Sequence, residues 1–119
     1  MIRQAAIIGI VTLHLAMPTV LNNYPDRVQP DVDGYIARID CGEIGRRYVL
    51  ELDGVTYLVA VADCAQPRDV QHLEYAFGGS WLADVDAVLW DDLPRYPQQA
   101  RLWPVRAWQM ERRRWSRIE

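Results

Sequence analysis

The chain has 119 residues, enough for one compact domain, and half of them are apolar, which excludes wholesale disorder. The net charge of −3 argues against a domain built to bind nucleic acid, and two cysteines exclude a disulfide-dense scaffold or a four-cysteine zinc site. The charge is uneven, because residues 22–100 have a net charge of −8 and residues 101–119 have +4. The sequence therefore predicts an acidic body followed by a basic tail.

The N-terminal segment has the pattern of an export signal. After Arg3, residues 5–21 are uncharged and mostly apolar, which is typical of a signal-anchor or a short transmembrane helix. Small residues do not occupy the positions that signal-peptide cleavage requires, so we expect residues 1–21 to form an uncleaved anchor helix. Residues 2–21 would then contact the membrane, and the C-terminal domain would be extracytoplasmic. The alternative is a helix buried against the domain, which Thr12 and His14 favour.

Short strands are predicted for most of the remaining chain. Residues 22–33 are rich in proline, asparagine and aspartate and predict a linker. Residues 34–110 predict a β domain, whose clearest element is a hairpin with the turn Asp53-Gly54. We expect strands at 34–39, 46–52, 55–62, 81–86 and 100–110, a strand or helix at 70–77, a short helix at 88–93, and a solvated basic tail at 111–119.

The order of motifs in the body resembles that of a known family. Gly45 precedes the hairpin, Asp63 directly follows its second strand, and the pair Val85-Asp86 opens a short helical segment. Over residues 35–93 this order resembles the double-psi β-barrel domain of the rare lipoprotein A, barwin and expansin type. The resemblance implies a mostly β fold, a small six-stranded double-psi-like barrel, here preceded by one N-terminal hydrophobic helix. It also implies a role in the cell envelope, often on peptidoglycan or polysaccharide.

The same resemblance implies candidate site residues. Asp63 and Asp86 match the family's acidic positions, and two carboxylates with different pKa values at one barrel mouth suit glycan cleavage. The alternative is that each carboxylate accepts backbone N–H bonds at a turn or helix start. Lytic members have a histidine where this chain has Arg38, and His72 is a candidate to replace it. Arg38, His72 and Trp81 are therefore candidate binding residues, with Trp81 either stacking on sugar rings or packing in the core.

The two cysteines lie at the ends of neighbouring strands in the barrel that the resemblance implies. A disulfide between Cys41 and Cys64 is the simple expectation for an exported domain. One alternative is half of a metal site with Asp63 and His72, although the spacing is poor for zinc. Another is a nucleophilic pair of Cys64 and His72.

These features predict a membrane-anchored extracytoplasmic β-barrel module with a non-catalytic binding or structural role in the cell envelope or a surface assembly. The first alternative is an enzyme that cleaves peptidoglycan or polysaccharide with Asp86 and Asp63, of the lytic transglycosylase or endoglucanase kind. The second alternative is a small accessory subunit of a membrane complex. Glycan, peptidoglycan and protein partners in an envelope assembly are the expected partners, and we expect no cofactor, no metal and no nucleic acid.

Overall fold

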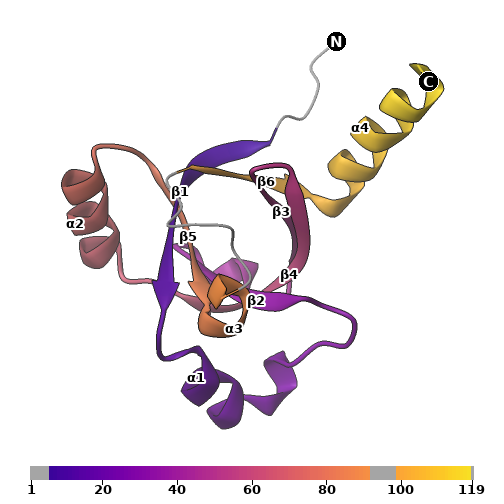
Figure 1. The fold of residues 1–119 in the computed structure, drawn as a ribbon. Coiled ribbons are helices and arrows are strands. Elements are labelled where there is room, and N and C mark those ends of the chain that lie inside the picture. Colours follow the sequence, from indigo (N-terminus) through magenta and orange to yellow (C-terminus); the bar gives the residue numbers. More distant parts are fainter. Residues whose placement is uncertain (1–5, 92–98, 119) are drawn as a thin grey trace.

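Six strands form a closed barrel in the computed structural model, which describes residues 6–91 and 99–118 (Figure 1). Around the barrel the strands follow the order β1-β5-β2-β4-β3-β6. Two neighbouring pairs, β1–β5 and β2–β4, are parallel, and the other four are antiparallel. The expected six-stranded β-barrel is therefore confirmed, and the structure shows that it is closed. The strands are β1 (Ile7–His14), β2 (Gly34–Arg38), β3 (Arg47–Leu52), β4 (Val55–Cys64), β5 (Trp81–Asp86) and β6 (Ala100–Pro104).

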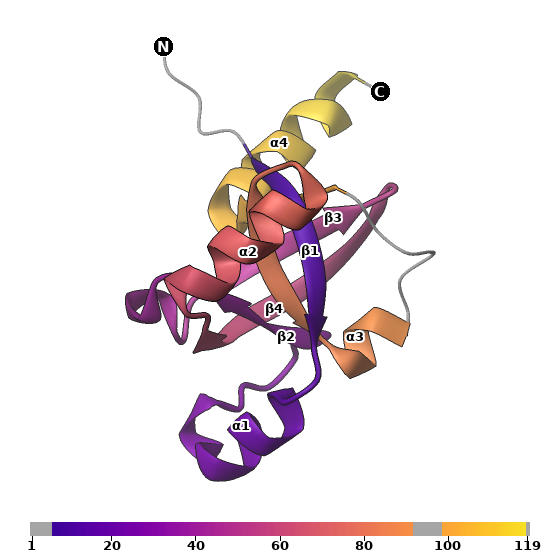
Figure 2. The same ribbon diagram turned by 90° about the vertical axis from the view of Figure 1, so that its left-hand side faces the viewer.

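The helices lie outside the barrel wall or at its ends. Figure 2 shows the helix at 67–77 in front of the barrel wall, where it contacts the strand at 81–86, and the helix at 105–118 projecting away from the strands. The positive φ of Gly78 ends the former in a left-handed cap. The helices are α1 (Met17–Asn23), α2 (Pro67–Phe77), α3 (Ala87–Asp91) and α4 (Val105–Ile118), with short 3-10 turns η1 (Pro25–Arg27) and η2 (Cys41–Glu43).

The expected N-terminal hydrophobic helix is wrong for residues 7–14, which form the barrel strand β1. This strand pairs with β5 and β6, so the barrel includes chain upstream of its expected start at Gly34. Three isoleucines, a valine and a threonine favour extended backbone here. Gly9 permits a close approach to β5, because a Cβ there would lie 2.9 Å from the Leu82 Cβ atom. No helix in residues 6–91 and 99–118 is long and apolar enough to cross a bilayer.

Two further segments differ from expectation. The expected linker 22–33 contains the end of α1 and the turn η1, and its residues bond to the barrel, as in the 2.9 Å bond from the Arg27 guanidinium to the Ala62 carbonyl. The expected strand 100–110 ends at Pro104, and the chain continues as α4 through the segment expected to be a solvated tail. Proline limits strand pairing, and the residues after it are mostly good helix formers.

The central hairpin is as expected. Strands β3 and β4 pair in antiparallel register from Arg47 opposite Ala60 to Leu52 opposite Val55. Asp53 and Gly54 form the turn with φ values of 50° and 79°, which suit a tight hairpin connection. Strand β4 extends to Cys64, so it delivers Asp63 to the end of the strand beside β2.

The barrel has an approximate internal symmetry of topology. Exchanging β1 with β4, β2 with β5 and β3 with β6 leaves every neighbour pair and its direction unchanged. Each half of the chain therefore supplies one strand to each parallel pair. The barrel interior is filled by apolar side chains from all six strands, with Leu89 of α3 covering one end; the largest fully buried strand residues are Ile36, Leu50, Val59, Val61, Leu82, Val85 and Leu102.

Candidate functional site

A row of four residues crosses four neighbouring strands at one level of the barrel. Thr12 of β1 is opposite Asp84 of β5, Asp84 is opposite Ala37 of β2, and Ala37 is opposite Asp63 of β4. Directly opposed residues point to the same face of a sheet, so these side chains share one face. The alanine between the two aspartates carries only a methyl group, which leaves room for their carboxylates above the sheet.

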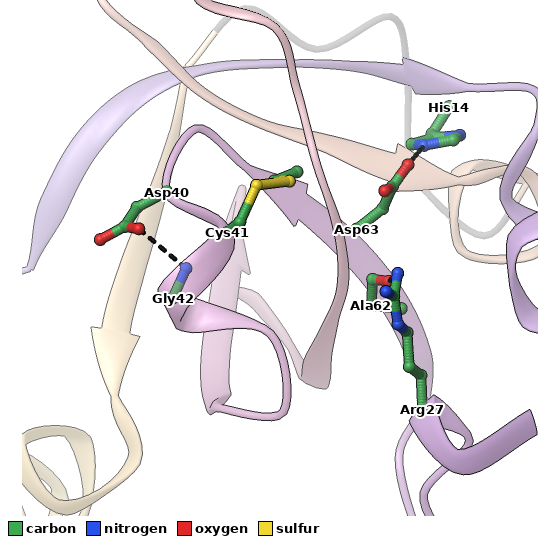
Figure 3. The surroundings of a disulfide bond; sticks show 8 residues. His14, Arg27, Asp40, Cys41, Gly42, Ala62 and Asp63 are labelled. Carbon is green, nitrogen blue, oxygen red and sulfur yellow. Dashed lines mark hydrogen bonds and ion pairs between the residues drawn. A yellow bond between two sulfur atoms is a disulfide. The ribbon is translucent and has the colours of Figure 1, made fainter. Parts of the chain in front are cut away.

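His14 adds an imidazole to this row. It lies two residues after Thr12 on β1 and therefore faces the same way. Its Nε2 atom is 2.9 Å from the Asp63 Oδ2 atom, and the two side chains are 11% and 28% exposed. Figure 3 shows the imidazole pointing directly at the carboxylate. The pair joins strand β1 to strand β4 although the two strands are not neighbours in the barrel.

Asp84 has a different environment from Asp63. Burial raises the pKa of Asp84, and the negative charge of nearby Asp63 raises it further, whereas a hydrogen bond from Thr12 and the proximity of His14 partly lower it. The Thr12 hydroxyl donates to Asp84 and accepts a 2.8 Å bond from the Trp81 indole. The site thus contains one carboxylate paired with an imidazole and a second carboxyl group whose pKa is raised, a combination of groups that acid–base chemistry uses.

Asp86, the other aspartate that the sequence analysis selected, has a structural contact. Its side chain is only 6% exposed and accepts a 3.2 Å bond from the Val88 N–H in the first turn of α3. This contact fits the alternative that the carboxylate satisfies a helix start. His14 is its partner in the register of β1 and β5, so Asp86 lies two residues beyond Asp84 on β5, outside the row itself.

Arg38 belongs to a separate polar cluster. One nitrogen of its guanidinium donates a 2.6 Å bond to the Leu82 carbonyl, and another lies 3.4 Å from a carboxylate oxygen of Glu43. The Tyr48 hydroxyl also donates to Glu43, and burial, followed by that bond, raises the pKa of Tyr48. Glu43 and Tyr48 are buried. The cluster therefore ties η2 to strands β2, β3 and β5.

The other two candidate binding residues, His72 and Trp81, differ in burial. His72 is exposed on α2, and the histidine that accompanies Asp63 is His14 instead. Trp81 is buried, and its indole supports the Thr12 hydroxyl. Sequence reasoning missed His14, Thr12 and Asp84 as members of a site. A signal was present, because polar residues alternate with apolar ones at 12 and 14 and again at 84 and 86, which is the period of a strand.

The expected disulfide between Cys41 and Cys64 is present, with Cα atoms 5.0 Å apart. It connects the start of η2 to the residue after Asp63 (Figure 3). The Asp40 carboxylate holds the adjoining turn through a 2.8 Å bond from the Gly42 N–H. Because both sulfurs are bonded to each other, neither serves as the thiolate nucleophile or metal ligand of the two alternatives. Within the part of the chain that the structure describes, no three His, Cys, Asp or Glu side chains are grouped to hold a metal ion.

Comparison of the chain with protein-family models, with curated proteins and with solved structures gives no match. A functional assignment therefore follows from the chemistry of the site itself: an imidazole–carboxylate pair, a second carboxyl group with a raised pKa, and a disulfide beside them.

Proposed function

We propose that the chain is an exported, double-psi-like β-barrel module that binds a glycan or peptidoglycan in the cell envelope without cleaving it. The two parallel strand pairs and the exchange symmetry of the strand order support the double-psi topology. The disulfide supports an extracytoplasmic location, since such bonds persist in oxidising compartments.

The observation that carries the proposal is the surface around the His14–Asp63 pair. Arg27, which donates to the Ala62 carbonyl beside Asp63, stacks over the Tyr24 ring with its guanidinium carbon 3.9 Å from the ring centroid. Tyr24 is 48% exposed. An aromatic ring and a guanidinium thus contact each other, and the guanidinium binds the backbone next to the carboxylate that pairs with the imidazole. Figure 3 shows Arg27, Ala62, Asp63 and His14 of this series. Sugars suit such a surface, because carboxylates accept their hydroxyl protons and aromatic rings stack on their apolar faces.

The experiment is a binding assay of the oxidised protein on insoluble peptidoglycan and on soluble amino-sugar oligomers. We expect Tyr24→Ala and Asp63→Asn each to weaken binding by about tenfold, the loss of one good contact. Tyr75→Ala is the matched control, because Tyr75 is 92% exposed and belongs to α2, which lies apart from α1 in both views (Figure 1, Figure 2). Failure of the folded wild type to bind either glycan would overturn the proposal, as would equal effects of the Tyr24 and Tyr75 variants.

A second candidate, cleavage of the same glycan, is favoured by the raised pKa of Asp84. A carboxyl group with a raised pKa suits a general acid, and Asp63, paired with His14, is placed to act as the second carboxyl group of such a reaction. Asp84 then takes the role that the resemblance assigned to Asp86. Release of new sugar ends from peptidoglycan, abolished by Asp84→Asn and unchanged by Asp91→Asn, would establish cleavage. Binding without release establishes the non-catalytic module.

A further inference from the structure

A pocket separate from the candidate site lies where the β3–β4 hairpin turns. Its volume is about 410 Å³, within the range of roughly 300–1,000 Å³ that is usual for small-molecule sites. His14 is six residues after Ile8 on β1, about 20 Å along an extended strand. Figure 2 shows the hairpin turn at the opposite end of the barrel from α1. The residues that line this hairpin-end pocket include Ile8, Glu51, Asp53, Ala100 and Arg101.

Three neighbouring strands supply the side chains of the hairpin-end pocket. Arg101 of β6 is directly opposite Ile8 of β1 on one side and Glu51 of β3 on the other. Directly opposed residues point to the same face of a sheet. Because Ile8 is 54% exposed and the Arg101 side chain 58%, this is the outer face of the barrel. Asp53 follows Glu51 by two residues, in the exposed hairpin turn. An aliphatic side chain, a guanidinium and two carboxylates therefore surround one opening.

The charged groups of the pocket are only partly paired with one another. The Arg101 Nη1 atom is 3.9 Å from the Glu51 Oε1 atom, which is too far for a hydrogen bond. The same oxygen accepts a 3.4 Å bond from the Trp103 indole. A guanidinium has several N–H donors in a planar fork, so Arg101 retains donors for a ligand. In residues 6–91 and 99–118, no side chain bonds to the Asp53 carboxylate.

We propose that the hairpin-end pocket binds a small amino acid of the lysine type, which carries one carboxylate and two ammonium groups. The Arg101 guanidinium binds the carboxylate, Asp53 and Glu51 bind the ammonium groups, and the aliphatic chain lies against Ile8. Two carboxylates and one guanidinium give the pocket a net charge of −1, which is complementary to such a ligand. A dicarboxylate meets two like charges, and a metal ion finds only two carboxylates beside a cation.

The test is an NMR titration of the full oxidised chain with lysine at constant pH and ionic strength, followed through the backbone amide signals. We expect saturable shifts at Ile8, Gly54 and Arg101, with a dissociation constant on the order of 1 mM, and none at His14. Norleucine, which lacks the second ammonium, and lysine amide, which lacks the carboxylate, should each bind about tenfold more weakly. Glutamate should not bind.

Two variants separate the contacts that the proposal requires. Asp53→Asn removes one carboxylate and keeps the turn, because Asn-Gly suits a tight hairpin as well as Asp-Gly does. It should weaken lysine binding about tenfold. Asp31→Asn is the matched control, because Asp31 is also exposed with a positive φ but does not line the pocket. Arg101→Gln should abolish the preference for lysine over lysine amide, whereas Arg68→Gln, at an exposed position on α2, should preserve it.

The outcomes that contradict this proposal are distinct from those that concern the glycan. Absence of a saturable shift at the pocket amides would overturn it, as would equal binding of lysine and glutamate or equal losses in the Asp31 and Asp53 variants. Calcium ions that shifted these signals when lysine did not would overturn it in favour of a metal site. Glycan binding is measured at the other end of β1, so its failure leaves this result unaffected.

Discussion

The two aspartates of the candidate site, Asp63 and Asp84, have different neighbouring side chains. Asp63 lies against an imidazole, with its Oδ2 atom 2.9 Å from the His14 Nε2 atom. The direct partner of Asp84 is Thr12, whose hydroxyl is neutral. Burial therefore dominates at Asp84 and raises its pKa. The methyl side chain of Ala37 separates their positions in the row of strands.

We expect Asp84→Asn to increase stability relative to the wild type at about pH 7 but not at about pH 3. Burial raises the folded-state pKa of Asp84 above its ordinary value of 3.8. Ionisation therefore costs free energy only in the folded state, and the cost develops as the pH rises between the unfolded and folded pKa values. Asparagine keeps an acceptor for Thr12 and carries no charge. Urea unfolding across this pH range measures the difference.

Asp91→Asn, at an exposed position in α3, controls for the loss of one negative charge. If the Asp84 variant is destabilised equally at both pH values, the raised pKa is contradicted. The NMR signal of the Asp84 carboxyl carbon, followed against pH, measures this pKa directly. A pKa at or below the ordinary value of 3.8 would contradict the prediction.

At the scale of secondary structure elements, β1 is the strand that closes the barrel. It joins β5 on one side to β6 on the other and contributes Val11 to the core. It also contributes Thr12 and His14 to the site. An apolar run at an N-terminus is compatible with a membrane helix or a buried strand, and pairing on both edges is what favours the strand here.

Gly9→Ala tests this strand. A Cβ at position 9 would lie 2.9 Å from both the Leu82 Cβ and the Ser80 carbonyl oxygen, so β5 would have to shift. We expect a loss of about 1–3 kcal/mol in the free energy of unfolding. Gly79→Ala is the control, because its Cβ would meet only the end of the Ile10 side chain at 3.1 Å. A helix at residues 7–14 predicts the reverse, since alanine favours helix over glycine.

Removing β1 should have a larger effect than removing α4. Deletion of residues 2–14 leaves the edges of β5 and β6 unpaired and takes Val11 from the core, so we expect loss of a cooperative thermal transition. Deletion of residues 105–119 leaves all six strands in place, so the transition should remain. Circular dichroism during heating measures both. Cooperative unfolding of the first variant would contradict the role of β1 in closing the barrel.

At the scale of the whole molecule, the disulfide links the two ends of a hairpin-containing segment. Cys41 and Cys64 are 23 residues apart and enclose η2, β3 and most of β4. The bond therefore restrains the unfolded chain over a substantial loop. It also fixes the end of β4 next to Asp63, so the fold and the site share this constraint.

We expect the double change Cys41→Ser and Cys64→Ser to lower the free energy of unfolding by about 3 kcal/mol, the value for closing a loop of this length. A reducing agent should have a similar effect on the wild type and none on the double variant. Guanidinium unfolding with and without the reducing agent measures this. Equal midpoints for the oxidised wild type and the double variant would show that the bond does not stabilise the fold.

The sequence alone was sufficient for the local features of this protein. Residues that tolerate positive φ predict the turn at Asp53-Gly54. Period-two alternation of apolar and polar residues predicts the strands beside the turn and the short strand at 81–86. Both signals are properties of residues that are adjacent in the chain. The pairing of the two cysteines followed from the arrangement of strands that the family resemblance implied.

Only the tertiary structure decided what the N-terminal run and the site residues do. The apolar sequence at 7–14 is a strand because β5 and β6 offer it hydrogen-bonding partners on both edges, and those partners are more than 60 residues away in the chain. The same pairing brings His14 to Asp63 across 49 residues and Thr12 to Asp84 across 72. Local patterns carry no information about such contacts, because register between distant strands is set by how all six pack around one core.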